Sequence, residues 1–256
     1  MSQQEENQSS AFKAVETLYE DLGENQAFWA VMTYPEYLDD KNEDAFFESG
    51  KEEVKAQIKR LAELNFDVQK GRCLDFGCGV GRLTNALAEH FESAVGVDVS
   101  STMIDRANKI RRQSNTEFVL NKREDLAQLE EASFDFVYSN KTIQHIPYPA
   151  SKNYIKDFFR LLKPGGLTVF LVHDCKHHEE GSFAFKLVKW HREKVRPFFK
   201  KLRGKPPVQI HPISKQNIEK FVTDAGGEIL HSETDTSYTR RKSGNLRTWY
   251  WARRKA

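Results

Sequence analysis

The sequence contains 256 residues, with 39 Lys and Arg residues against 37 Asp and Glu residues, so its formal net charge is +2. This near balance excludes a globally basic nucleic-acid-binding protein. Hydrophobic residues make up 39% of the chain, enough for the core of one large domain. No apolar run approaches the roughly 20 residues that span a bilayer. The polar N-terminus lacks a signal-peptide pattern and the three cysteines suit free thiols, so we expect a cytoplasmic protein.

Charge is unevenly distributed along the chain. Residues 1–60 hold six basic and 14 acidic residues, whereas residues 181–210 hold nine basic residues and a single acid, Glu193. Two interpretations stay open. In the first, both stretches are solvated faces or pair with each other across the fold. In the second, the basic stretch binds an anionic partner.

The first quarter of the chain is expected to lie outside the sheet. Residues 1–10 are polar and predict a disordered leader. Residues 11–65 predict an N-terminal helical cap, acidic and aromatic in its first part. Within it, residues 51–65 predict a surface helix, because apolar residues recur at helical spacing. These are Val54, Ile58, Leu61 and Leu64.

Residues 66–256 are expected to form the main domain, in which strand and helix patterns alternate. Short apolar runs predict strands at 73–76, 94–97, 117–120, 134–139 and 167–172. Apolar residues at helical spacing predict helices around 83–91, 103–110 and 154–162. Strands buried on both faces and joined by helices are typical of a doubly wound, mostly parallel sheet in an α/β fold.

The alternation breaks at residues 173–213, a basic and aromatic insertion after the fifth strand. Helical spacing resumes around 218–222, and two strands are predicted at 227–234 and 245–254. In the last one Leu246, Thr248, Tyr250 and Ala252 face one way, and Arg247, Trp249, Trp251 and Arg253 the other. The two late strands predict an antiparallel hairpin at the sheet edge.

A glycine-rich loop follows the first predicted strand, in the segment LDFGCGVGR at 74–82. Its spacing is G-x-G-x-G, and Arg82 stands where the dinucleotide fingerprint has its third glycine, which disfavours hydride transfer. Asp98 closes the second strand, where a carboxylate accepts hydrogen bonds from two ribose hydroxyls. Strand, loop and acid together indicate a nucleoside ligand.

Four segments resemble motifs of the class I S-adenosylmethionine-dependent methyltransferases. They are LDFGCGVGR, VDVS with Met103-Ile104, SFDFVYSN with IQHIP, and LLKPGG. The resemblance covers residues 72–172 and, more weakly, 213–253. It implies a Rossmann-like methyltransferase fold, in which the seventh strand of a seven-stranded sheet is inserted antiparallel. It also implies S-adenosylmethionine as the cofactor and a methyltransferase activity.

The resemblance also implies cofactor contacts. Those expected around the methionine end of the cofactor are Asp75, Gly77, Cys78, Gly79, Arg82 and Asn140. Asp98 would hold the ribose, and Val99 and Met103 would pack on the adenine. Lys122 stands where the family often has an acid. The remaining candidate adenine contacts are the Arg123 backbone and the side chains of Glu124 or Asp125.

His145 is the candidate general base for a hydroxyl acceptor. It follows the fourth strand, at the edge where ligands of such folds bind, and imidazoles titrate near neutral pH. The alternative is a histidine that only orders the start of a helix. Glu48 and Tyr19 in the cap are weaker candidates.

A dense group of metal-capable side chains follows the fifth strand: His173, Asp174, Cys175, His177 and His178. Neighbours such as His177 and His178 rarely bind one ion together, so we expect no metal site. We favour an acceptor pocket or a surface loop there. The insertion at 173–213 is expected to be a lid over that pocket, in preference to a membrane or nucleic-acid surface.

The sequence therefore predicts methyl transfer to an oxygen or nitrogen of a small molecule. One alternative is an RNA-, protein- or lipid-directed methyltransferase that uses the basic insertion. Another is a cofactor-binding protein without catalysis. No pattern in the chain indicates an oligomeric state.

Overall fold

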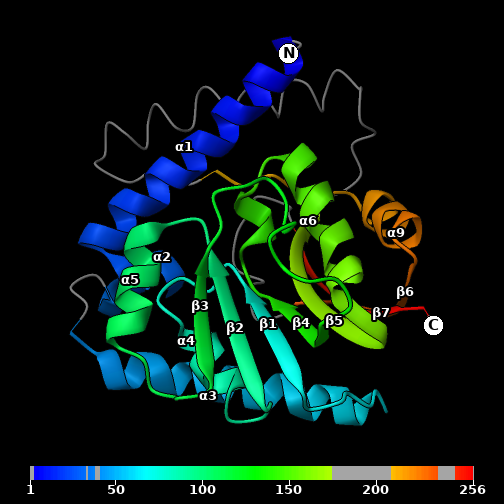
Figure 1. The fold of residues 1–256 in the computed structure, drawn as a ribbon, viewed down its shortest axis with the longest axis horizontal. Coiled ribbons are helices and arrows are strands. Elements are labelled where there is room, and N and C mark those ends of the chain that lie inside the picture. The colour runs from blue at the N-terminus through cyan, green and yellow to red at the C-terminus, as the bar shows by residue number, and fades with distance from the viewer. Residues whose placement is uncertain (1–2, 33, 38–40, 175–208, 236–245, 256) are drawn as a thin grey trace.

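A computed structural model describes the chain except residues 1–2, 33, 38–40, 175–208, 236–245 and 256. Its centre is a seven-stranded sheet of order β3-β2-β1-β4-β5-β7-β6 (Figure 1). The strands are β1 Arg72–Phe76, β2 Ser93–Asp98, β3 Thr116–Leu120, β4 Phe134–Ser139, β5 Leu162–Asp174, β6 Gly227–Thr234 and β7 Leu246–Arg254. β7 lies antiparallel between β5 and β6, and the pairs among β1 to β5 are parallel. The predicted doubly wound, seven-stranded sheet is confirmed.

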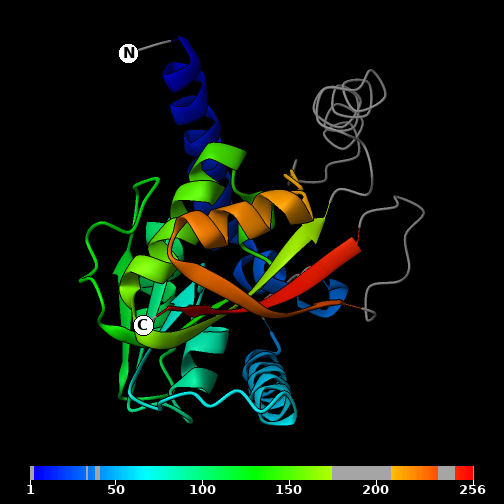
Figure 2. The same ribbon diagram turned by 90° about the vertical axis from the view of Figure 1, so that its right-hand side faces the viewer.

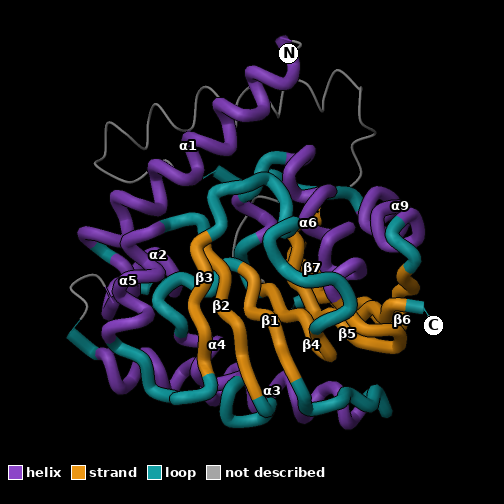
Figure 3. Tube along the Cα trace, in the orientation of Figure 1, coloured by secondary structure: helices purple, strands orange, loops and turns teal. Residues whose placement is uncertain are grey.

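Helices cover both faces of this sheet (Figures 2 and 3). Those described are α1 Gln3–Asn25, α2 Ala27–Met32, η1 Pro35–Tyr37, α3 Glu43–Glu63, α4 Arg82–Leu87, α5 Ser101–Lys109, η2 Ile143–His145, α6 Tyr148–Leu161 and α9 Lys215–Asp224. Side chains of α3 and α4 pack into one apolar cluster, and those of α6 and α9 into another on the opposite face. Among the described residues, no helix has the length and apolar character needed to cross a bilayer.

Burial on both faces explains the apolar strand sequences. All six residues of β4 are buried. In β7, Tyr250 and Ala252 belong to the cluster that includes α6 and α9, whereas Trp251 belongs to the cluster that includes α3 and α4. The alternation predicted for this strand therefore matches the two faces of the sheet.

Two element boundaries differ from prediction. The strand expected at 167–172 begins at Leu162, because Leu162 pairs with Phe134 before an irregularity shifts the register to Phe136 and Leu167. The helix expected at 51–65 begins at Glu43, because its first turns bury Phe46 in a ring stack on Phe28, with centroids 4.2 Å apart.

The N-terminal residues also differ from prediction. In place of a disordered leader over residues 1–10, helix α1 begins at Gln3. Gln and Glu are good helix formers, so the polar stretch continues the helix outward from its packed part. Further along α1, Phe12 is buried and its ring lies 6.5 Å from that of Tyr154 on α6.

Glu20 joins α1 to the N-terminus of α5. Its carboxylate accepts hydrogen bonds from the backbone N–H groups of Ser101 (2.9 Å) and Thr102 (3.0 Å), and from the hydroxyls of Ser100, Ser101 and Thr102. The first N–H groups of a helix have no partner within the helix, and they favour a nearby anion. Burial acts to raise the pKa of Glu20, but the hydrogen bonds from Ser101 and Thr102 hold it well below its usual range.

We expect Glu20→Gln to lower the free energy of unfolding by about 1–2 kcal/mol at pH 7. A carboxyl whose pKa is depressed by folding contributes stability above its unfolded pKa, about 4.3, and loses it as the pH falls through the folded pKa. The difference between wild type and variant should therefore shrink below pH 4. Urea unfolding at a series of pH values measures it, with Glu24→Gln, at an exposed position on α1, as the control. An equal loss in both variants would contradict the capping role.

Candidate functional site

The carboxyl ends of β1, β2 and β4 meet at one edge of the sheet, which is where open α/β sheets bind ligands. The loop after β1 is anchored there, because the backbone N–H groups of Gly77 and Cys78 both donate to the Val97 carbonyl, at 2.8 and 3.0 Å. Gly77, Gly79 and Gly81 have positive φ angles of 76°, 53° and 84°. These are backbone conformations that favour glycine.

Steric contact also restricts position 77 to glycine. A Cβ added there would lie 2.2 Å from both Oγ1 and Cγ2 of Thr142, in the loop after β4. Thr142 in turn donates a hydrogen bond to the Gly77 carbonyl at 3.4 Å. The glycine loop and the loop after β4 therefore form one tightly fitted wall of the site.

We expect Gly77→Ala to destabilise the fold by about 2 kcal/mol more than Gly165→Ala. Both positions have positive φ, but a Cβ at Gly165 meets nothing within 4 Å. The difference thus isolates the collision with Thr142 from the backbone strain. Thermal unfolding of both variants measures it, and Thr142→Ala in the Gly77→Ala background should restore part of the loss. Equal destabilisation by the two glycine substitutions would show that the glycine loop and the loop after β4 separate without cost, and it would contradict the steric fit.

Asp98 lies at the end of β2 and faces this loop. Its Oδ2 accepts a hydrogen bond from the Gly79 N–H at 2.8 Å, and its Oδ1 accepts one from the Ser100 N–H at 3.0 Å. Burial raises the pKa of this carboxyl. The side chain is only partly covered, and a carboxylate offers about four acceptor positions, so acceptor capacity remains for a ligand with two vicinal hydroxyls.

Asp75, Arg82 and Asn140 make polar contacts with residues of α3 and α4. Asp75 accepts a hydrogen bond from the Thr84 hydroxyl at 2.7 Å, and burial raises its pKa to about 7. Arg82 is 2% exposed and forms an ion pair of 2.7 Å with Glu53 of α3. The other carboxylate oxygen of Glu53 accepts hydrogen bonds from Asn140 and from Tyr138 at 3.3 Å.

Glu53 was not predicted as a site residue. Residues 51–65 contain several acids on the polar part of the helix, and their spacing does not indicate which one turns toward the sheet. Cys78 is buried in the loop, with burial raising the pKa of its thiol. Cys73 and Cys78 are free thiols, and Cys175 lies outside the described residues.

The predicted adenine contacts divide into buried and surface groups. Met103 is 1% exposed and packs in an apolar cluster with Phe28 and Val80, whereas Val99 is only partly buried. Arg123 and Asp125 form an ion pair of 2.7 Å in the loop after β3, and this partner lowers the pKa of Asp125. Burial raises the pKa of Glu124 between them.

His145 ends η2 at the same edge of the sheet. Its Nδ1 lies 2.8 Å from the carbonyl of Gln209, so Nδ1 carries the hydrogen and the lone pair of the neutral ring is on Nε2. The side-chain amide of Gln144 lies 2.8 Å from Nε2. Tyr19 of α1 lies near His145, with ring centroids 6.2 Å apart. Glu48, the other cap candidate, is exposed on α3.

Part of the predicted site falls outside the described residues. Of the metal-capable group after β5, the structure describes His173, which is buried, and Asp174, but not Cys175, His177 or His178. In the described part of the chain, no group of three His, Cys, Asp or Glu residues is arranged to hold a metal ion. Nearly all of the expected lid, residues 175–208, also lies outside it.

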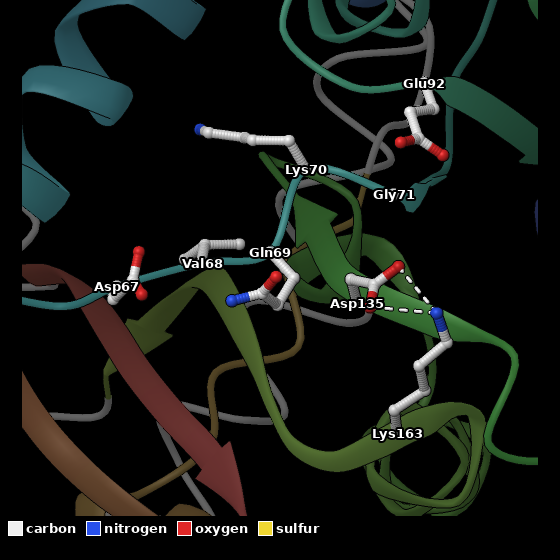
Figure 4. Close-up of a pocket in the computed structure, with 8 residues that line it drawn as sticks. All are labelled: Asp67, Val68, Gln69, Lys70, Gly71, Glu92, Asp135 and Lys163. Carbon is white, nitrogen blue, oxygen red and sulfur yellow. Dashed lines mark hydrogen bonds and ion pairs between the residues drawn. The ribbon is translucent and has the colours of Figure 1, made fainter.

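A hollow of about 550 Å³ lies at the opposite edge of the sheet (Figure 4). It is lined by Asp67, Val68, Gln69, Lys70, Gly71, Glu92, Asp135 and Lys163, none of which was a predicted site residue. Lys163 Nζ lies 2.9 Å from both carboxylate oxygens of Asp135, which also accepts the Arg72 backbone N–H at 2.8 Å. These contacts tie the first residues of β5 to β4 and to the start of β1.

Comparison with known proteins finds similarity to methyltransferases. Residues 74–170 match the family model described as a methyltransferase domain. A ubiquinone biosynthesis O-methyltransferase of Methylococcus capsulatus is 35% identical over 101 residues, which cover 39% of this chain and 42% of the relative. The match therefore spans less than half the length of that relative.

Solved structures share the fold. A SAM-dependent methyltransferase from Methanosarcina mazei aligns with a TM-score of 0.55 and 21% identity, covering 73% of this chain and 94% of that one. The magnesium protoporphyrin IX methyltransferase of Synechocystis, solved with bound SAH, aligns with a TM-score of 0.54 and 19% identity, covering 81% and 84%. The predicted Rossmann-like methyltransferase fold is confirmed.

Proposed function

We propose that this protein transfers the methyl group of S-adenosylmethionine to an oxygen atom of a small molecule, since residues 74–170 match the model of a methyltransferase domain. The observation that carries this proposal is the placement of Asp98. Its carboxylate closes β2 and faces a loop of three glycines with positive φ, at the ligand-binding edge of the sheet.

The residues at this edge fit S-adenosylmethionine. The backbone of Gly79, which carries no side chain, donates a hydrogen bond to Asp98. The Asp98 carboxylate would also accept hydrogen bonds from the ribose hydroxyls. Among the described residues, the Oδ1 atom of Asn140 is buried without a hydrogen-bond partner, so it can accept from the ammonium group of the methionine part. When bound, the cofactor supplies a methyl group activated by a sulfonium.

The protein's own task is then to position an acceptor and to remove its proton. His145 is the group we assign to proton removal. The Gln209 carbonyl fixes its tautomer with the lone pair on Nε2, and an acceptor hydroxyl would take the place of the Gln144 amide at that nitrogen. Oxygen as the acceptor atom is supported by relatives named O-methyltransferases.

A labelled-methyl experiment tests this function. The wild-type protein is incubated with S-adenosylmethionine carrying a labelled methyl group and with a panel of phenols, carboxylic acids and amines, and products are identified by mass spectrometry. We expect label on a hydroxyl or carboxyl oxygen. Label on amines alone would move the acceptor atom to nitrogen. Cofactor binding without any transfer would favour a non-catalytic protein, and label on RNA, protein or lipid would favour a different acceptor class.

A further inference from the structure

Lys141 occupies a fixed position beside the proposed methyl-donor site. It lies two residues beyond β4, with a positive φ of 61°. Its neighbours anchor it on both sides, because Asn140 donates to Glu53 and Thr142 donates to the Gly77 carbonyl. The loop therefore holds the Lys141 backbone between the glycine loop and α3.

The charged residues that act most strongly on Lys141 already form ion pairs with one another. Among the charged groups that act on its ammonium, Glu53, Arg82, Arg247 and Asp235 have the largest effects. Arg82 pairs with Glu53 at 2.7 Å, and Arg247 pairs with Asp235 at 2.6 Å. These four groups thus form two ion pairs with one another and not with Lys141.

The ammonium group of Lys141 itself makes no hydrogen bond or ion pair with any residue in the described part of the chain. The side chain is half-buried, and this burial lowers the pKa of the ammonium. A cation that has lost water without gaining a partner carries a free-energy cost, which an incoming anion removes. The loop after β4, at the ligand-binding edge, thus carries a partly desolvated cation that has no hydrogen-bond or ion-pair partner among the described residues.

We propose that Lys141 binds a carboxylate or phenolate group of the methyl acceptor. This inference rests on the proposed function, because it names the acceptor class of the same site. The same chemistry is offered by the carboxylate of the cofactor's methionine part, and the experiment below separates the two sources. A cation without a direct partner favours an anionic acceptor and opposes a protonated amine, so it also selects for oxygen methylation.

The test is calorimetric titration of the protein saturated with S-adenosylhomocysteine, using salicylate and its neutral analogue salicyl alcohol as probes. We expect wild type to bind salicylate about 10-fold more tightly than salicyl alcohol. Lys141→Gln should remove this preference, and Lys141→Arg should keep it. Lys109→Gln, an exposed position on α5, is the matched control for the loss of one charge and should also keep it. Equal melting temperatures exclude misfolding of the variants.

The outcomes separate the two anion sources. If wild type shows no preference for salicylate, or Lys141→Gln keeps it, the acceptor assignment is overturned. If Lys141→Gln weakens binding of S-adenosylhomocysteine about 10-fold but leaves that of methylthioadenosine unchanged, the anion is the cofactor's carboxylate, since methylthioadenosine lacks it. Failure of wild type to bind S-adenosylhomocysteine at all would instead contradict the proposed function.

Discussion

Replacing Asp98 with alanine is expected to weaken binding of S-adenosylhomocysteine by about 100-fold or more. Hydrogen bonds from two ribose hydroxyls to a charged acceptor contribute roughly 2–4 kcal/mol, and the substitution removes the acceptor. It also removes the partner of the Gly79 N–H, which holds the glycine loop in place. Equilibrium dialysis with the labelled product cofactor measures the change.

Two further variants make this result specific. Asp105→Ala removes a carboxylate from an exposed position on α5, so it should leave cofactor affinity unchanged. Asp98→Asn keeps the shape and part of the hydrogen bonding, so its loss should be intermediate. Thermal unfolding checks that each variant is folded. Wild-type affinity in a folded Asp98→Ala variant would remove the ribose-binding role.

Replacing His145 with alanine is expected to lower kcat by about 100-fold while cofactor affinity stays intact, if His145 removes the proton of a hydroxyl acceptor. Wild-type activity should then rise with pH across the range in which imidazoles titrate, near pH 6–7. Steady-state kinetics on an acceptor found in the labelled-methyl experiment, measured from pH 5 to pH 9, gives both results.

His90→Ala is the matched control, because His90 is also partly buried but follows α4 at the far end of the sheet. It should leave kcat unchanged. Gln144→Ala should not reproduce the large loss, since it removes the amide that lies against Nε2 and leaves the imidazole in place. Full activity and an unchanged pH profile in His145→Ala would assign proton removal to another group.

The sheet could be predicted from sequence because its strands are short, apolar and bounded by polar loops. The prediction for β4 matched at every residue, 134–139. In β7, strict alternation assigned Tyr250 and Trp251 to opposite faces, as found. The start of β5 was missed, because the pairing of Leu162 with Phe134 depends on a neighbouring strand and not on local pattern.

The polar contacts of the candidate site were less predictable. Helical periodicity indicates which face is buried, but not which charged residue beside that face meets a partner. Glu53 and Arg82 are 29 residues apart and meet only because α3 packs on α4. Glu20 and Thr102 are separated by 82 residues. By contrast, Asp98 and the glycine loop belong to one β–α–β unit of β1, the loop, α4 and β2, which explains why local pattern placed them together.

The most direct test of the central claim is a calorimetric titration of the wild-type protein with S-adenosylhomocysteine, with NAD⁺ titrated in parallel. The glycine spacing, the Asp98 carboxylate and the methyltransferase-domain match predict saturable binding of one S-adenosylhomocysteine per chain, far tighter than that of NAD⁺. Preferential binding of NAD⁺, or no binding of S-adenosylhomocysteine, would contradict the account.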